Sequence, residues 1–245
     1  MVRSQEPPIL DFSVFYGSDS QAKTKLLQDV RECCLKNGFF QITGHRVSRE
    51  LQRRTMSCVE RFFHLQLEEK LKIDRSQNPF NRGYEVMQSH MSQPGSSPDL
   101  KEGLFIALDD LEEFKRTTME YYDAVFQLAK DIIALLALTM NGDGGLFAPY
   151  TDGAVATLRY LHYPPKPPKT YDNARGCGAH RDYSGITILL QDEVGALQVL
   201  DEPTGQWLDI KSTPGAYVVN LANLFSRMTN ETYKSALHRS SIRLG

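Results

Sequence analysis

The spacing of apolar residues changes near Gly145, and this change constrains the fold more than any other feature. Before it, the apolar residues from Tyr121 to Leu135 step by four, three, four and three, the spacing of one face of an α-helix. After it come short runs rich in β-branched and aromatic residues, which are typical of strands. These runs cover residues 158–163, 186–190, 197–200, 217–219 and the region around His238. The sequence therefore predicts an α+β protein, with a mainly helical supporting region over residues 1–150 and a β-rich core over residues 151–245.

Local signals set the limits of several elements in the first region. Residues 20–36 carry a helical apolar stripe that ends before Gly38, and residues 39–42 then have the composition of a strand. Ser48 can cap a second helix, because its side-chain oxygen can accept from a free backbone N–H. The Asn, Gly and Pro residues between 77 and 98 predict a loop.

The composition is that of a globular protein, with 41% hydrophobic and 24% charged residues in a chain of 245. The formal net charge of -2 favours neither nucleic acid nor an anionic membrane as a partner. No run approaches the roughly 18 apolar residues of a membrane span, and no apolar segment of a secretory signal stands at the start. The four cysteines fit neither a zinc site nor a disulfide framework, so we expect reduced thiols and a cytoplasmic protein.

Three side chains in the β-rich part have the chemistry of a metal site. His180 and Asp182 stand two residues apart, and His238 follows downstream. Two histidines and one carboxylate form the facial triad that binds Fe(II) and leaves positions open for oxygen and substrate. On a strand, residues two apart point to the same side, so His180 and Asp182 can reach one metal together. The alternatives are a chance His-x-Asp pair and a structural role for His238.

Several segments in order along nearly the whole chain resemble the non-haem Fe(II), 2-oxoglutarate-dependent dioxygenases of the isopenicillin N synthase-like branch. Ordered motifs of this kind are far more specific than one His-x-Asp pair. The segments are residues 37–45 (NGFFQITGH), 81–84 (NRGY), 99–103 (DLKEG), 158–165 (LRYLHYPP), 180–192 (HRDYSGITILLQD), 219–223 (VNLAN) and 229–239 (TNETYKSALHR).

This resemblance implies a double-stranded β-helix, or jelly roll, with helices packed outside it. It implies that His180, Asp182 and His238 are the iron ligands and the catalytic centre. It also implies that Tyr163 contacts the distal carboxylate of 2-oxoglutarate, to which a phenol O–H can donate. The implied reaction uses O2 and 2-oxoglutarate to hydroxylate, desaturate or rearrange a small organic substrate, in a family that often serves secondary metabolism.

The C-terminal residues depart from the family pattern. The family places an Arg-x-Ser pair after its last histidine, and the arginine binds the 2-oxoglutarate carboxylate through its two-pronged guanidinium. Here Arg243 is the candidate anchor, but Gly245 stands where the serine would follow. The last jelly-roll strand is therefore expected to be missing. Ala222 and Asn223 also replace the family's usual Gly-Asp pair.

Two alternatives follow from this departure. An iron oxidase on the same fold would need no 2-oxoglutarate, and release of succinate would separate it from a dioxygenase. A non-catalytic protein with a shortened barrel would bind a ligand without turning it over. The sequence does not indicate the substrate, the outcome of the oxidation or the oligomeric state.

Overall fold

The computed structural model describes residues 6–87, 99–105, 112–140, 142–154, 156–164 and 176–241, so Arg243 lies outside the described residues. The chain forms two compact units. The first comprises Met1–Arg46, Val125–Ala154 and His180–Arg239, and the second comprises Val47–Ala124, Val155–Ala179 and Ser240–Gly245. Both units take segments from each side of residue 150, and a division of the chain at that residue stays a prediction.

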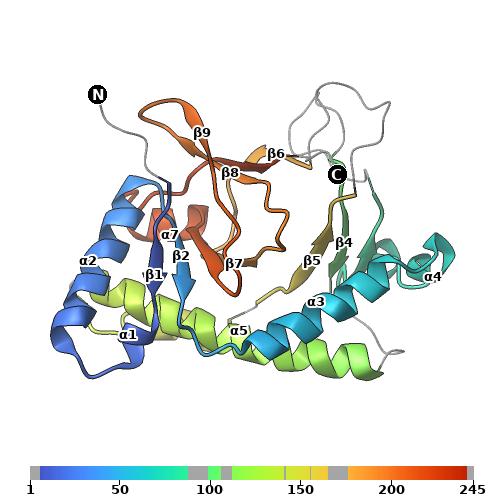
Figure 1. Cartoon of the computed structure of the whole chain (residues 1–245), viewed down its shortest axis with the longest axis horizontal. Helices are drawn as coiled ribbons and strands as arrows, with labels where there is room; N and C mark the ends of the chain where they lie inside the picture. Colours follow the sequence, from blue (N-terminus) through green and yellow to red (C-terminus); the bar gives the residue numbers. More distant parts are fainter. Residues whose placement is uncertain are drawn as a thin grey trace. The chain divides into compact units, whose positions relative to one another are not determined.

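Two four-stranded sheets are built mainly from the first unit (Figure 1). The first sheet has the order β1 (Ile9–Asp11), β2 (Phe39–Thr43), β10 (Tyr217–Leu221) and β7 (Ile186–Leu190). In it β1 runs parallel to β2, and the other pairs are antiparallel. The second sheet has the order β6 (Cys177–His180), β11 (His238–Ser240), β8 (Leu197–Asp201) and β9 (Gln206–Asp209).

Apolar side chains from both sheets share one core. Phe39 and Val218 come from the first sheet and Val199 from the second, and they form a buried cluster with Ile210 and Ala236. The two sheets therefore pack against each other through this shared core, as in a two-layered β structure. This layered β core with helices outside it agrees with the predicted jelly roll.

Helix α2 follows the limits that its sequence predicted. The helices of the first unit are α1 (Ser13–Tyr16), α2 (Ser20–Lys36), α6 (Ala148–Thr151), α7 (Asn223–Met228) and the C-terminal part of α5 (Glu112–Thr139). The Asp19 side chain caps α2 by accepting from the backbone N–H groups of Gln21 and Ala22. After α2, Gly38 has a φ of +73°, and a Cβ there would lie 2.0 Å from the carbonyl oxygen of Lys234. Only glycine suits this turn, which brings the chain into β2.

The segment before β11 is tied to α2 and to the end of α5. The Arg31 guanidinium donates to the Thr139 carbonyl at 2.9 Å and to the Tyr233 hydroxyl at 3.3 Å. The hydroxyls of Thr139 and Tyr233 also bond to each other at 2.8 Å. These bonds connect three segments that are far apart in sequence, and they position the chain that leads to His238.

The second unit contains the sheet β3 (Gly83–Glu85), β4 (Glu102–Phe105) and β5 (Arg159–His162), with antiparallel pairs. Its helices are α3 (Arg49–Phe63), α4 (Leu67–Leu71), the 3-10 turn η1 (Arg75–Gln77) and the N-terminal part of α5. Ser48 caps α3 as predicted, accepting from Leu51 N at 3.1 Å. The prediction of a loop is wrong at β3, because pairing with β4 overrides the local turn composition. Residues 88–98 of that segment lie outside the described residues.

A buried carboxylate organises the second unit. Glu102 accepts from Lys70 Nζ at 2.8 Å and from the Tyr84 hydroxyl at 2.5 Å, and its other oxygen is 2.8 Å from His162 Nδ1. Burial alone would raise the pKa of Glu102. The hydrogen bonds from His162, Lys70 and Tyr84 have the larger effect and lower this pKa to about 2. Glu102 thereby connects α4 to all three strands of the sheet.

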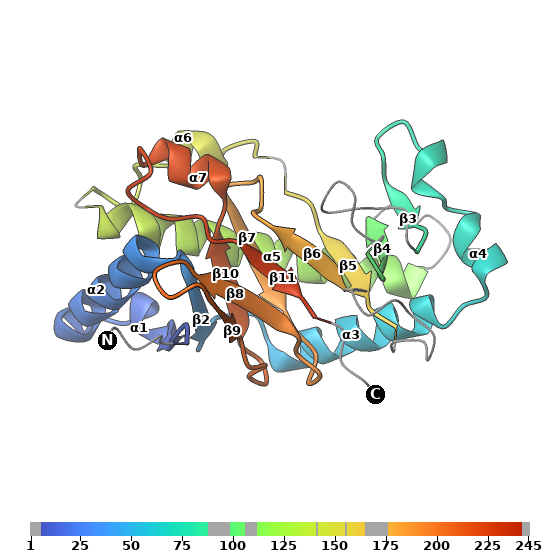
Figure 2. The ribbon, with the colours of Figure 1, turned by 90° about the horizontal axis from the view of Figure 1, so that it is seen from above.

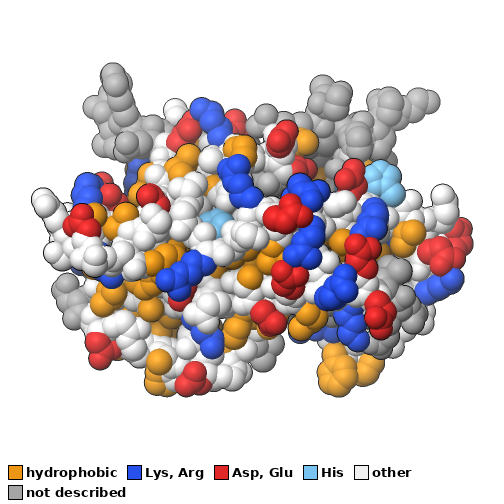
Figure 3. Space-filling view, turned by 60° about the horizontal axis from the view of Figure 1, so that its bottom comes forward, with side chains coloured by type: hydrophobic (Ala, Val, Ile, Leu, Met, Phe, Trp, Pro, Cys, Tyr) orange, Lys and Arg blue, Asp and Glu red, His pale blue; other side chains and the backbone are white. Residues whose placement is uncertain are grey.

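Acidic and basic side chains are interspersed on the face shown in Figure 3, in keeping with the small net charge of -2. Among the helices that the structure describes, none combines the length and the apolar character needed to cross a bilayer.

Candidate metal centre

The structure brings His180, Asp182 and His238 together within the first unit. His180 is the last residue of β6, Asp182 follows two residues later, and His238 is the first residue of β11. Each side chain offers a ligand atom, and these atoms lie within 4.8 Å of one another. Asp182 Oδ1 is 3.5 Å from His180 Nε2 and 3.4 Å from His238 Nε2. The local reason is that β6 and β11 are neighbours in the second sheet, so their ends meet.

The two imidazoles of this triad differ in their surroundings. The His238 side chain is only 9% exposed, and its ring packs edge-on against Phe39. Its Nδ1 lies 3.2 Å from the carbonyl oxygen of Ala236, which can accept only when Nδ1 carries the proton. That bond selects the tautomer in which Nε2, the nitrogen facing Asp182, has a free lone pair. His180 is 34% exposed, so one side of the triad is open to solvent.

Asp182 is held as a carboxylate. Its Oδ2 accepts from Thr187 Oγ1 at 2.6 Å and from Asn220 Nδ2 at 2.9 Å. Burial acts to raise the pKa of Asp182, but the neighbouring imidazoles of His180 and His238, together with the hydrogen bond from Asn220, outweigh it and hold that pKa far below its ordinary value. An ionised carboxylate beside two imidazole nitrogens is the donor set of a divalent first-row metal, and it contains no thiolate that would favour zinc. The residues of the site therefore fit Fe(II).

Tyr163 belongs to the second unit, where it follows β5. Its phenol hydrogen-bonds to the Ser240 side chain, and burial of the phenol, with Cys177 nearby, raises its pKa. Its role toward a cosubstrate stays a prediction, as does that of Arg243, which lies outside the described residues.

The comparisons with known proteins decide the family. A family model described as the 2OG-Fe(II) oxygenase superfamily matches residues 153–243, and one described as the N-terminal region of a non-haem dioxygenase in morphine synthesis matches residues 7–126. A "2-oxoglutarate-Fe(II) type oxidoreductase" of Aspergillus fumigatus is 64% identical, over 98% of this chain and 78% of the relative. A second protein of that description, from Emericella nidulans, is 52% identical over 95% of this chain and 74% of the relative.

The chain belongs to the 2OG-Fe(II) oxygenase superfamily. Solved structures agree: a full-length Neurospora crassa protein in complex with alpha-KG (2-oxoglutarate) matches with a TM-score of 0.86 and 26% identity. That match covers 96% of this chain and 78% of the other. The predicted family, jelly-roll fold and enzyme class are confirmed. The protein is an enzyme that uses Fe(II), 2-oxoglutarate and O2 to oxidise a small molecule.

Two residues of this oxygenase site were not found from the sequence. Thr187 interrupts the apolar strand β7, and Asn220 interrupts the buried strand β10. Each is a polar residue within an apolar run, and such residues need a hydrogen-bond partner when buried. That signal could have marked them as functional, but it does not say which group they contact.

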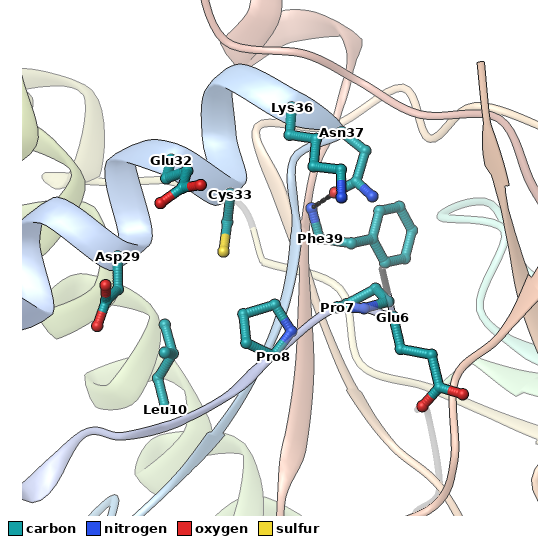
Figure 4. A pocket seen from close by; sticks show the side chains of 10 residues that line it. All are labelled: Glu6, Pro7, Pro8, Leu10, Asp29, Glu32, Cys33, Lys36, Asn37 and Phe39. Carbon is teal, nitrogen blue, oxygen red and sulfur yellow. Dashed lines mark hydrogen bonds between the residues drawn. The ribbon is translucent and has the colours of Figure 1, made fainter. Parts of the chain in front are cut away.

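Two of the cavities formed by the described residues lie in the first unit, and neither of these two is lined by a triad residue. The larger, of about 450 Å³, is lined by Arg181, whose side chain donates to the Ser235 carbonyl at 2.7 Å and pairs with Glu202. The other, of about 280 Å³, lies between α2 and the residues before β1 (Figure 4). It is lined by Glu6, Pro7, Pro8, Leu10, Asp29, Glu32, Cys33, Lys36, Asn37 and Phe39.

Proposed function

We propose that His180, Asp182 and His238 are the Fe(II) ligands of this oxygenase. The observation that carries this assignment is the convergence of their ligand atoms within 4.8 Å. When bound there, Fe(II) supplies the redox chemistry by which O2 oxidises 2-oxoglutarate to succinate and CO2 and the substrate at a C–H bond. The chain's own residues prepare the site: Ala236 orients His238, and the bonds at Asp182 keep it ionised.

We further propose a small organic substrate of secondary metabolism. Relatives that are about one third identical support this, among them a clavatol oxidase of Penicillium crustosum, which is 32% identical over 95% of this chain. The Neurospora crassa protein was also solved with thymine beside alpha-KG, so a planar molecule of that size is a suitable first candidate. We place the enzyme in the cytoplasm, since none of the four cysteines, all of which lie within the described residues, forms a disulfide.

For the cosubstrate, we propose that Tyr163 donates to the distal carboxylate of 2-oxoglutarate and that Arg243 is a second candidate contact. A hydrogen bond to a charged group contributes about 1.5–3 kcal/mol, which corresponds to about tenfold or more in affinity. Tyr163→Phe should therefore raise the dissociation constant of 2-oxoglutarate at least about tenfold. Arg243→Ala, measured in parallel, shows whether Arg243 contributes as well.

The iron assignment is tested by anaerobic titration of Fe(II) into the protein, followed by 2-oxoglutarate and detection of the charge-transfer absorption. His180→Ala should abolish the absorption, and His64→Ala is the matched control, because His64 is exposed and its Nδ1 lies 2.7 Å from the carbonyl oxygen of Glu60 in its own helix. Turnover is then measured as the release of succinate in the presence of O2 and each member of a substrate panel that includes thymine. Fe(II)-dependent oxidation without succinate would instead indicate an oxidase that does not use 2-oxoglutarate.

A further inference from the structure

The two oxygens of Asp182 have different partners. Oδ1 faces the imidazoles of His180 and His238, at 3.5 and 3.4 Å. Oδ2 faces away from them and accepts two hydrogen bonds, from Thr187 Oγ1 at 2.6 Å and from Asn220 Nδ2 at 2.9 Å. One oxygen is therefore satisfied by the protein, and the other is left for a cation.

The two donors come from a single cross-strand pair. Thr187 in β7 and Asn220 in β10 stand directly opposite each other in the antiparallel ladder, and Figure 2 shows these strands as neighbours. Directly opposite residues have side chains on the same face, so one carboxylate oxygen can contact both. Asn220 is buried, at 4% exposure, which limits the other conformations open to its amide.

The backbone around Asp182 is held by the same part of the sheet. Asn223 N donates to the Asp182 carbonyl at 2.9 Å, and Ala222 N donates to the Gly185 carbonyl at 3.0 Å. These bonds join the segment after β6 to the end of β10. Rotation of the Asp182 side chain would break the bonds to Thr187 and Asn220, while the backbone bonds keep its Cα in place.

We infer that Thr187 and Asn220 are positioning residues that hold Oδ2 of Asp182, so that the carboxylate offers a single oxygen, Oδ1, to the metal. This inference rests on the proposed assignment of Asp182 as an iron ligand. Carboxylates bind metals through one oxygen or through both. A facial triad works because its open positions accept cosubstrate and oxygen, and a carboxylate that bound through both oxygens would occupy one of them.

The test compares Thr187→Val with Thr187→Ser. Valine keeps the shape of threonine and its preference for a strand but lacks the donor, whereas serine keeps the donor. Loss of a hydrogen bond that orients a metal ligand typically lowers metal affinity about 10–100-fold. Thr187→Val should therefore weaken Co(II) and Fe(II) binding in anaerobic titrations by at least about tenfold. Thr187→Ser should restore affinity to within about threefold of the wild type.

A spectroscopic readout separates positioning from general stability. The visible bands of the Co(II)-loaded protein depend on coordination number, so Thr187→Val should change their intensity and Thr187→Ser should restore it. Asn220→Leu should act in the same direction, and if that variant does not fold, the Thr187 pair carries the test alone. Thr204→Val is the matched control, because it also removes a Thr-to-Asp bond (2.5 Å, to Asp201) within the first unit.

Asp182→Ala distinguishes failure of this inference from failure of the iron assignment. Suppose that Asp182→Ala abolishes metal binding, but Thr187→Val and Asn220→Leu have the metal affinity and the Co(II) spectrum of the wild type. The positioning role is then refuted, and the assignment of Asp182 as a ligand stands. If Asp182→Ala leaves metal affinity unchanged, both are refuted. Weakening by Thr204→Val equal to that by Thr187→Val would also refute the inference, because the effect would then not be specific to the bond at Asp182.

Discussion

Asp182 in the first unit and Glu102 in the second are both largely buried carboxylates with several partners, yet they serve different purposes. Both oxygens of Glu102 are occupied by groups of the protein, namely Lys70, Tyr84 and His162. Only one oxygen of Asp182 is held by neutral donors, and the other faces two imidazoles whose ring centroids are 4.3 Å apart. A fully satisfied carboxylate stabilises a fold, whereas a half-satisfied one beside imidazole nitrogens leaves a place for a cation.

The largest expected effect is on metal binding. Asp182→Ala should abolish succinate release and lower Fe(II) affinity by more than about a hundredfold, since loss of a ligand exceeds loss of a supporting bond. Glu102→Gln should leave Fe(II) affinity within about threefold of the wild type, because Glu102 has no part in the triad. Anaerobic titration of both variants checks this contrast. Equal losses in the two variants would show that the carboxylates do not differ as we argue.

The next effect is on stability. Glu102→Ala leaves the ammonium of Lys70 buried without its partner, since the Lys70 side chain is only 9% exposed. Removing one partner of a buried ion pair costs about 3–5 kcal/mol. Urea unfolding of the metal-free protein should show a loss of that size. A loss below about 1 kcal/mol would contradict the role of Glu102 as the centre of the second unit.

The acid dependence of stability should also reflect Glu102. Its pKa in the fold, about 2, lies below the ordinary value of 4.5. Its ionised form therefore stabilises the fold above about pH 4.5, and this contribution of about 3 kcal/mol is lost as the pH falls toward 2. Unfolding free energies measured over this range should fall less steeply in Glu102→Gln. An unchanged slope would show that other groups dominate the acid response.

The smallest predicted effects come from a matched pair of glycines. Gly38 in the first unit and Gly83 in the second both have positive φ, and a Cβ on either would lie about 2 Å from a backbone carbonyl oxygen. Each alanine substitution should lower stability by about 1–3 kcal/mol, measured as a drop in Tm. Only Gly38→Ala should also weaken Fe(II) binding, because the carbonyl it displaces belongs to Lys234, in the segment that leads to His238. If Gly83→Ala weakened Fe(II) binding and Gly38→Ala did not, the expected difference between the two glycines would be refuted.

Much of this enzyme was readable from the sequence because the signals were local. The helix over residues 20–36 that ends before Gly38, the strands predicted at 186–190 and 217–219, and the same-side placement of His180 and Asp182 depend on neighbouring residues. Resemblance to a family favoured a ligand role for His238 over the alternative of a structural histidine. The mistaken loop at β3 shows where local composition fails, since that strand exists through its pairing with β4.

Only the tertiary structure decided what surrounds the carboxylates. Thr187 and Asn220 meet at Asp182 because of the register between β7 and β10, and that register is set by packing of the two sheets. Glu102 likewise collects partners from α4, β3 and β5. A sequence states which side chains can donate or accept a hydrogen bond. Which of them meet is decided by long-range pairing of strands, because the energy of that pairing comes from burial across the whole core and not from adjacent residues.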